Sequence, residues 1–178
     1  MNNPAGRTVG PGQVITLARR SAWRREYEMR SGRGALGWLR WRPGRRSAAQ
    51  AEGRGIGLID LATRRRRVVV AAAGAATLAT VDRGRGGSVI HTAGGRALRW
   101  EKTARGNHWA MRDQDGTVLV IAASHGLLRS SVQISAERAM PEHTAVLLCL
   151  IGGYLALGEL QHKADLAAAT AAAAAGSG

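Results

Sequence analysis

Hydrophobic and polar residues alternate in short runs through most of the chain. In the run from Leu128 to Ser135, Leu128, Val132 and Ile134 fall on one face, and the other face is entirely polar. A period of two residues is typical of a strand with one buried and one exposed face. The run from Glu26 to Arg30 repeats the pattern. These runs predict strands of an antiparallel sheet.

Turn-forming residues separate these runs every eight to twelve residues, as in Arg105-Gly106-Asn107 and Asp113-Gln114-Asp115-Gly116. Glycine, asparagine and aspartate provide the tight turns that connect neighbouring antiparallel strands. The spacing predicts about twelve strands. They fall near residues 13–19, 23–31, 34–42, 48–52, 55–61, 66–73, 76–82, 87–92, 96–103, 107–113, 117–123 and 128–136.

One segment near the C-terminal end departs from this pattern. Pro141 and Glu142 suit the start of a helix, and the fifteen residues from Thr144 to Gly158 contain no charge. A helix that is apolar on every side lies in a protein core or spans a membrane. Because fifteen residues extend only about 22 Å, short of the roughly 30 Å of hydrocarbon, we favour a core helix over about residues 142–162. Its expected packing residues are Leu147, Leu150, Ile151, Gly152, Gly153 and Leu155.

Together these patterns predict a mainly β fold, a closed antiparallel barrel of about twelve strands with a central buried apolar C-terminal helix. A chain of 178 residues suits one domain of this kind. We expect a flexible N-terminal lead over residues 1–11, the barrel and helix over 12–163, and a disordered alanine-rich tail over 164–178.

Basic residues outnumber acids by 26 to 12, which gives a net charge of +14. Arginine supplies 24 of them, and the two lysines are Lys102 and Lys163. Residues 1–67 contain 16 arginines and four acids, a net charge of +12, so the excess lies in the first third. Two explanations of this arginine excess stay open. One is selection for guanidinium contacts to phosphate, and the other is a coding bias that enriches arginine, alanine and glycine together.

Arginine clusters in the first third are the candidate anion-binding residues. Four consecutive arginines in a strand would alternate between faces, so a loop or strand end suits residues 64–67 better. Lipid headgroups and nucleic-acid phosphates are the anions that such a surface attracts, and a solvated surface without a ligand is the alternative. The candidates are Arg19, Arg24, Arg42, Arg45, Arg46, Arg64, Arg65, Arg66 and Arg67.

Residues that support catalysis or metal binding form no typical pattern. The five histidines have no metal-ligand spacing, and the single cysteine, Cys149, lies within the apolar helix. We therefore expect no enzymatic activity, no metal and no cofactor. The chain has a single cysteine, and residues 1–12 are polar, without the apolar run of a secretory signal. These features predict a cytoplasmic protein, with a peripheral position on the inner face of the membrane as one option.

The order of the predicted strands and helix resembles the tubby C-terminal-like superfamily, which includes the LURP-one-related proteins and the phospholipid scramblases. Tyr27-Glu28-Met29-Arg30, followed by Gly34 and Leu36, looks like the aromatic strand, turn glycine and following hydrophobic residue of that family. Trp109-Ala110-Met111-Arg112-Asp113, followed by Gly116 and Leu119, repeats it. The resemblance covers residue 13 to about residue 163 and implies that the helix threads the closed barrel.

The resemblance also implies a class of function. Tubby domains bind phosphoinositide headgroups through basic residues on the barrel, whereas the Pro-rich region and cysteine cluster of scramblases have no counterpart here. We therefore expect a non-enzymatic binding module that docks on anionic lipid headgroups, or on another polyanionic partner, through its arginine-rich face. The alternatives are a nucleic-acid-binding barrel and a structural or assembly protein with a protein partner or with itself.

Overall fold

The described strands form one large antiparallel sheet that closes into a barrel. The computed structural model describes residues 7–21, 24–43, 48–64, 67–72, 76–84, 87–103, 106–125 and 130–175. The barrel strands within these ranges are β2 (Val14–Arg19), β3 (Glu26–Ser31), β4 (Gly34–Trp41), β5 (Ala48–Gly53), β6 (Gly57–Arg64), β7 (Arg67–Ala72), β8 (Thr77–Gly84), β9 (Gly87–Thr92), β10 (Ala97–Lys102), β11 (His108–Asp113), β12 (Gly116–His125) and β13 (Ser130–Ala136).

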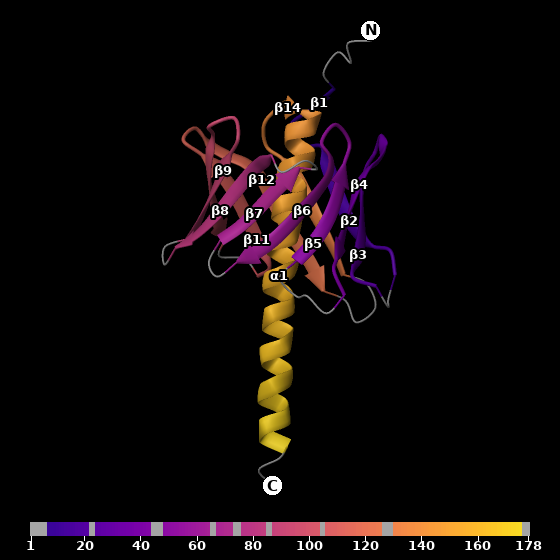
Figure 1. The fold of residues 1–178 in the computed structure, drawn as a ribbon, viewed down its shortest axis with the longest axis vertical. Helices are drawn as coiled ribbons and strands as arrows, with labels where there is room; N and C mark the ends of the chain where they lie inside the picture. Colours follow the sequence, from indigo (N-terminus) through magenta and orange to yellow (C-terminus); the bar gives the residue numbers. More distant parts are fainter. Residues whose placement is uncertain are drawn as a thin grey trace.

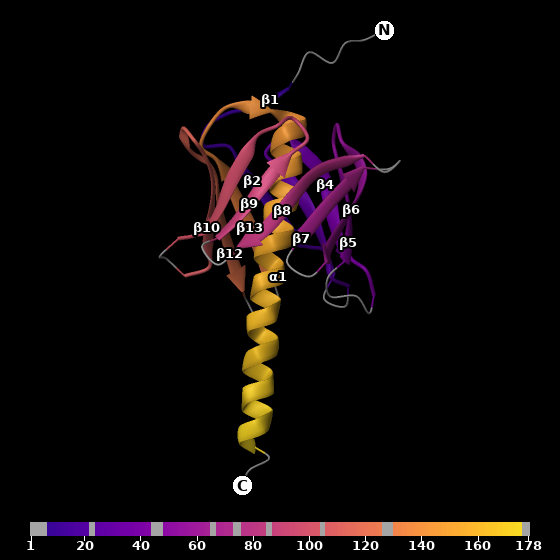
Figure 2. The ribbon, with the colours of Figure 1, turned by 60° about the vertical axis from the view of Figure 1, so that its left-hand side comes forward.

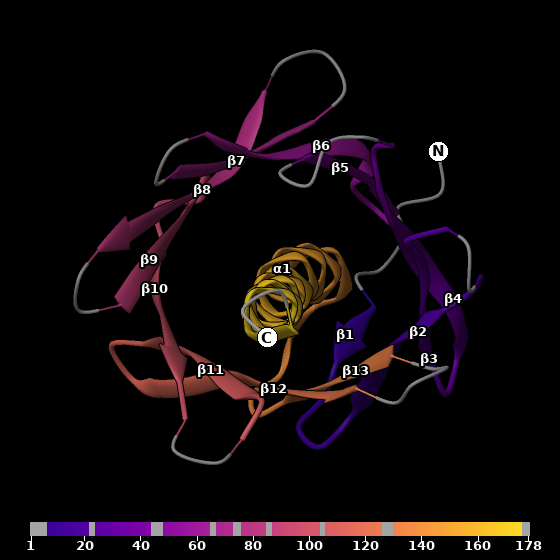
Figure 3. The ribbon, with the colours of Figure 1, turned by 90° about the horizontal axis from the view of Figure 1, so that it is seen from below.

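Each barrel strand pairs with its neighbours in chain order, with one exception that joins distant parts of the chain. The strand order is β10-β11-β12-β13-β2-β3-β4-β5-β6-β7-β8-β9. The pairing of β13 with β2 closes the ring, since β10 pairs with both of its chain neighbours, β9 and β11. Figure 3 shows the ring from below. The predicted mainly β, antiparallel fold with a C-terminal helix is confirmed.

Two hairpins share the geometry that the repeated sequence motif suggested. The hairpin β3–β4 turns at Gly34, and the hairpin β11–β12 turns at Gly116. Both glycines have positive φ, 110° and 117°, which favours glycine over other residues. In each hairpin the register shifts immediately after the inward-facing methionine, Met29 or Met111. The motif residues therefore encode the same bulged hairpin twice.

Helix α1 (Glu142–Ala175) runs through the barrel and fills its interior. Its buried residues include Leu150, Ile151, Gly152, Gly153 and Leu155, as predicted from the sequence. Leu147, also predicted to be buried, is only partly buried and packs against the edge of the core. The strands contribute the alternating apolar side chains of the sequence pattern, so one core contains both strand and helix residues.

The ends of the chain differ from the sequence predictions. Helix α1 continues to Ala175, so the predicted helix end near residue 162 and the predicted disordered tail are wrong for residues 164–175. Alanine has the highest helix propensity, and extending an existing helix needs no new nucleus. The predicted flexible lead is also wrong for β1 (Thr8–Val9), which pairs with β14 (Met140–Pro141) because Val9 and Met140 are buried.

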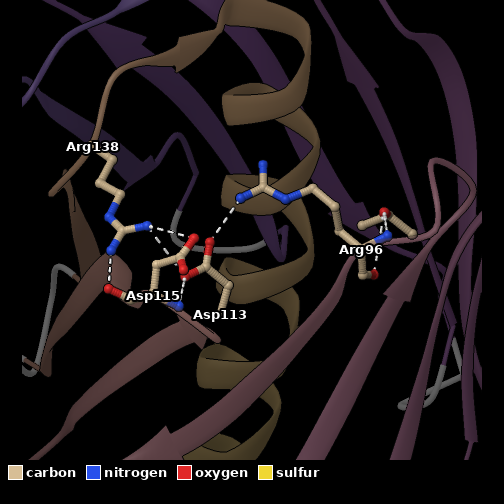
Figure 4. A network of polar contacts seen from close by, with 5 residues as sticks. Arg96, Asp113, Asp115 and Arg138 are labelled. Atoms are coloured by element: carbon tan, nitrogen blue, oxygen red, sulfur yellow. Dashed lines mark hydrogen bonds and ion pairs between the residues drawn. The ribbon is translucent and has the colours of Figure 1, made fainter.

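A network of polar contacts joins three segments around Asp113 at the end of β11 (Figure 4). Asp113 accepts hydrogen bonds from Arg96 Nη2 at 2.8 Å, from Arg138 Nη1 at 3.3 Å and from the backbone N–H of Asp115 at 2.9 Å. Burial acts to raise the pKa of Asp113, but these three partners outweigh it, so the pKa lies below the ordinary 3.8. The network fastens the turn before β10 and the segment after β13 to the hairpin β11–β12.

We predict that Asp113→Asn lowers the free energy of unfolding by about 1–3 kcal/mol at neutral pH, because two guanidinium groups lose the negative charge of their shared partner. Because its folded pKa is depressed, the Asp113 carboxylate stabilises the fold above its ordinary pKa, and this contribution is lost as the pH falls through the folded value. Denaturant unfolding at neutral pH and in acid measures both effects.

The matched control is Asp115→Asn, because the Asp115 side chain is 82% exposed and pairs with Arg138 at 3.6 Å. Exposed ion pairs contribute little, so the control should change stability by less than about 1 kcal/mol. Equal losses for the two variants, or a loss for Asp113→Asn that persists unchanged in acid, would contradict the proposed role of the network.

Candidate anion-binding site

The two ends of the barrel are distinguished by the direction of α1. A Cβ atom at Gly53, the last residue of β5, would meet Val146 of the first helical turns. At the opposite end of β6, Thr63 Oγ1 lies 2.9 Å from the hydroxyl oxygen of Tyr154, further along the helix. We call these ends the start end and the exit end. Beyond the exit end, α1 projects away from the barrel (Figures 1 and 2).

Basic residues gather at the exit end. Because the strands are antiparallel and sequential, every second link of the chain lies at the same end. Strands β2, β4, β8 and β10 all run toward the exit end, and each finishes at or beside a basic residue. We define the exit rim as the arginines and lysines at this end whose side chains the structure describes. They are Arg19, Arg20, Arg24, Arg25, Arg42, Arg83, Lys102 and Lys163.

Three of the predicted candidates belong to the exit rim, with different degrees of freedom. Arg24 is exposed. Arg19 Nε donates to the carbonyl of Ser21 at 2.9 Å, which holds its guanidinium beside the rim. Arg42 forms an ion pair with Asp60 at 2.5 Å, so this carboxylate offsets part of its charge. The structure therefore places Arg19, Arg24 and Arg42 at the same end of the barrel.

The remaining candidates are described only in part. Arg64 and Arg67 lie opposite each other where β6 and β7 meet at the exit end, which agrees with the expected strand-end placement. Arg45, Arg46, Arg65 and Arg66 lie outside the described residues.

Sequence reasoning missed Arg83, Lys102 and Lys163 as parts of the same surface. Arg83 and the two lysines lie outside the arginine-rich first third, so clustering along the sequence did not select them. The signal was present in the predicted meander, because Arg83 and Lys102 occupy alternate strand ends. A search for basic residues at every second strand end, rather than for dense arginine clusters along the sequence, would have found them.

Acidic residues compensate the basic residues at the start end more fully than at the exit end. At the start end Arg54 pairs with Glu142 at 3.8 Å, and Arg96 and Arg138 share Asp113. At the exit end Glu26 is the buried acid, and its chief partner is Arg40 of the barrel wall, at 2.9 Å. The Arg40 hydrogen bond is the main reason that the pKa of Glu26 is lowered. The negative charge of Glu26 therefore offsets mainly the charge of Arg40 in the barrel wall, and only weakly that of Arg20 in the exit rim, at 3.8 Å.

Aromatic residues line the exit mouth around a cavity of about 310 Å³. The Trp41 ring stacks on Tyr154 with centroids 5.6 Å apart, and the Arg25 guanidinium lies 5.6 Å from the centroid of Trp41. Burial raises the pKa of Tyr154, while the Thr63 hydrogen bond and the nearby Arg83 oppose that rise. Because Glu159 and Asp165 also line this cavity, its charge is mixed and its cations do not act alone.

On the other side of α1, two tryptophans hold Glu159. The Trp100 and Trp109 rings stack with centroids 6.0 Å apart. Trp109 Nε1 donates to Glu159 Oε2 at 2.9 Å, and Trp100 Nε1 donates to Oε1 at 3.4 Å. These contacts fix the helix at the level of the exit rim, and they satisfy a carboxylate without using a basic residue.

Side chains for metal binding or thiol chemistry do not assemble in the described part of the chain. No group of three or more His, Cys, Asp or Glu residues there is placed to hold a metal ion. Burial raises the pKa of the Cys149 thiol to about 12, so the thiol is protonated at neutral pH. Among the described helices, α1 is long and apolar enough to cross a membrane, and 72% of its apolar window is buried inside the barrel.

Comparison with known proteins supports a shared architecture. No protein-family model and no curated protein matches the chain. The fold is similar to the X-ray structure of a protein from Arabidopsis thaliana, AT5G01750, with a TM-score of 0.50 and 17% sequence identity. The match covers 80% of this chain and 90% of the plant protein. At this identity the similarity defines a class of fold, a β-rich protein with a C-terminal helix.

Proposed function

We propose that the chain is a tubby-like or LURP-one-like barrel that acts as a non-enzymatic binding module and docks on anionic membrane surfaces through the exit rim. The gathering of basic residues at one end of the barrel carries this proposal. A cation near an anionic membrane surface contributes about 1 kcal/mol, so several cations facing the same plane give substantial affinity. A cytoplasmic location would present the rim to the leaflet that is rich in anionic lipids.

The undescribed segments of the chain add to its overall positive charge. The links between the described strand ends contain Arg45, Arg46, Arg65, Arg66, Arg85, Arg105 and Arg129, which lie outside the described residues. The same undescribed link residues include no acid. The attraction they add is strongest at low ionic strength, because the Debye length is only about 8 Å in physiological salt.

Co-sedimentation with lipid vesicles tests the proposal. We predict that the full chain binds phosphatidylcholine vesicles that contain phosphatidylglycerol, does not bind vesicles of phosphatidylcholine alone, and dissociates as salt is raised. The double variant Arg20→Gln/Arg24→Gln removes two rim charges and should weaken binding roughly 30-fold, since each charge contributes about 1 kcal/mol.

The charge-matched control is Arg7→Gln/Arg33→Gln, which removes two arginines from the start end. It should leave vesicle affinity within about threefold of the parent chain. Equal weakening by the two double variants, or equal binding to neutral vesicles, would overturn the proposal. Binding to duplex DNA that exceeds binding to heparin of equal charge would instead favour the nucleic-acid function.

A further inference from the structure

Helix α1 continues beyond the exit end of the barrel as an exposed, uncharged rod. We call residues 166–175 the stalk. Every residue of the stalk is exposed, and apart from Leu166 and Thr170 all of them are alanine. Leu166 is one of the exposed large hydrophobic residues of the described chain, with 55% of its surface accessible. The stalk therefore presents an uncharged surface on every side, outside the core of the barrel.

The stalk stands beyond the exit rim along the axis of the barrel. Seen from below, α1 lies inside the ring, with β2 and β4 on one side of it and β8 and β10 on the other (Figure 3). These are the strands that finish at the exit rim. From Lys163, the rim residue on α1, to Ala175 the helix extends about 18 Å. A flat surface that contacts the rim on both sides of the mouth must therefore accommodate the stalk.

The length of the stalk determines how closely the rim can approach such a surface. If the tip of the stalk met the surface and stopped there, the rim would stay about 18 Å away from it. Electrostatic attraction in physiological salt decays over about 8 Å, so most of the attraction of the rim would be lost. Contact around the whole mouth therefore requires a surface that the stalk can enter. A lipid bilayer is such a surface, whereas the close-packed interior of a folded protein is not.

The dimensions and the chemistry of the stalk suit one leaflet of a bilayer. The hydrocarbon core is about 30 Å thick and the whole bilayer about 40–45 Å, so one headgroup layer and one leaflet of hydrocarbon together measure about 20 Å. With the rim at the headgroups, a rod of about 18 Å stays within this depth. Backbone groups within a helix bond to one another, as hydrocarbon requires. Thr170 Oγ1 donates to the carbonyl of Leu166 at 3.0 Å, so this hydroxyl is also satisfied within the helix.

We propose that the stalk inserts into one leaflet of the membrane while the exit rim binds the lipid headgroups around it. The inference rests on the proposed docking of the exit rim, and it adds the orientation of the docked chain. The buried part of α1 ends at Leu160 and stays inside the barrel, so the inserted part is the stalk and not the core of the helix. The axis of the barrel then points into the membrane.

Depth-dependent quenching measures insertion of the stalk. An environment-sensitive thiol dye is attached to Ala168→Cys or Ala172→Cys of the full-length chain, and Cys149 is buried and stays unlabelled. Vesicles of phosphatidylcholine and phosphatidylglycerol carry a nitroxide quencher either near the headgroup or deep in the acyl chains. Residue 172 lies about 6 Å further along the stalk than residue 168. We expect the shallow quencher to act more strongly at residue 168, the deep quencher more strongly at residue 172, and neither at the control Ala93→Cys of the start end.

A cation placed on the stalk separates insertion from attraction at the surface. If the stalk stayed outside the membrane, Ala172→Lys would strengthen binding to the same vesicles roughly fivefold, as one more cation near an anionic surface. If the stalk inserts, the new ammonium group must enter hydrocarbon, and we expect binding to weaken roughly tenfold. The control Ala93→Lys should stay within about threefold of the parent chain. Residues 93 and 172 are both exposed, and circular dichroism verifies that each variant is folded.

The outcomes separate this inference from the proposed function. Vesicle binding that depends on the rim arginines, together with stronger binding of Ala172→Lys and no quenching on the stalk, would overturn insertion and leave membrane docking intact. Quenching on the stalk that persists undiminished in Arg20→Gln/Arg24→Gln and at high salt would support insertion and overturn docking through the charges of the rim. Equal quenching at residues 93, 168 and 172 would overturn the proposed orientation.

Discussion

Trp109→Ala is expected to lower the free energy of unfolding by about 3–5 kcal/mol, the largest loss that we predict for a single substitution. The Trp109 side chain is completely buried, stacks on Trp100 and donates to Glu159 at 2.9 Å. The variant would leave a cavity between the barrel wall and α1 and would also remove one donor from a partly buried carboxylate. Denaturant unfolding followed by circular dichroism measures the loss.

Trp38→Ala is the matched control for this substitution. Trp38 Nε1 also donates to a glutamate, Glu52, at 2.9 Å, but its side chain lies on the outer wall of the barrel. Its replacement should cost about 1 kcal/mol, because no cavity forms in the core. If the two tryptophan variants lost equal stability, the packing of α1 against the wall at Trp109 would be wrong.

Gly152→Ala is expected to lower the free energy of unfolding by about 2–3 kcal/mol, although alanine ordinarily stabilises a helix by about 1 kcal/mol relative to glycine. A Cβ atom at Gly152 would lie 2.3 Å from Ile121 Cδ1 and 2.9 Å from Met111 Cε. Both side chains are fully buried within the barrel, so neither has free space into which it can move. The steric cost should therefore exceed the gain in helix propensity.

The same helix provides a control with the opposite expected sign. A Cβ atom at Gly158 would meet nothing within 4 Å. Gly158→Ala should therefore raise the free energy of unfolding by about 1 kcal/mol through helix propensity alone. Gly153→Ala should fall between the two, because its nearest contact is Leu17 Cδ2 at 3.1 Å. Stabilisation by all three variants would mean that the strands do not enclose the helix.

Much of this architecture follows from local patterns in the sequence. Alternation of apolar residues and regular turn residues placed the barrel strands within a few residues of their observed bounds, as for β4 and β9. The uncharged run from Thr144 to Gly158 identified the core of α1. The pairing of β13 with β2 depends on contacts between distant segments, and alternation within one strand contains no information about its partner.

The candidate site was harder to predict than the fold. The arginines of the first third were selected because they cluster along the sequence. The exit rim is instead defined by the end of the barrel at which each strand finishes. Lys163 illustrates the difficulty, because the helix end and the tail were placed too early in the sequence analysis. Lys102 ends a predicted strand, but its place at the exit end follows only from the directions in which the strands run.

Fluorescence of a probe at each end of the barrel tests membrane docking most directly. Ala164→Cys, just beyond the exit rim on α1, and Ala93→Cys, in the link between β9 and β10 at the start end, are both exposed. Because Cys149 is buried and protonated, an environment-sensitive thiol dye labels the new cysteine selectively. With vesicles that contain phosphatidylglycerol and quencher lipids, we predict a blue shift and quenching at residue 164 and neither effect at residue 93. Quenching at residue 93 alone, or equally at both positions, would contradict docking through the exit rim.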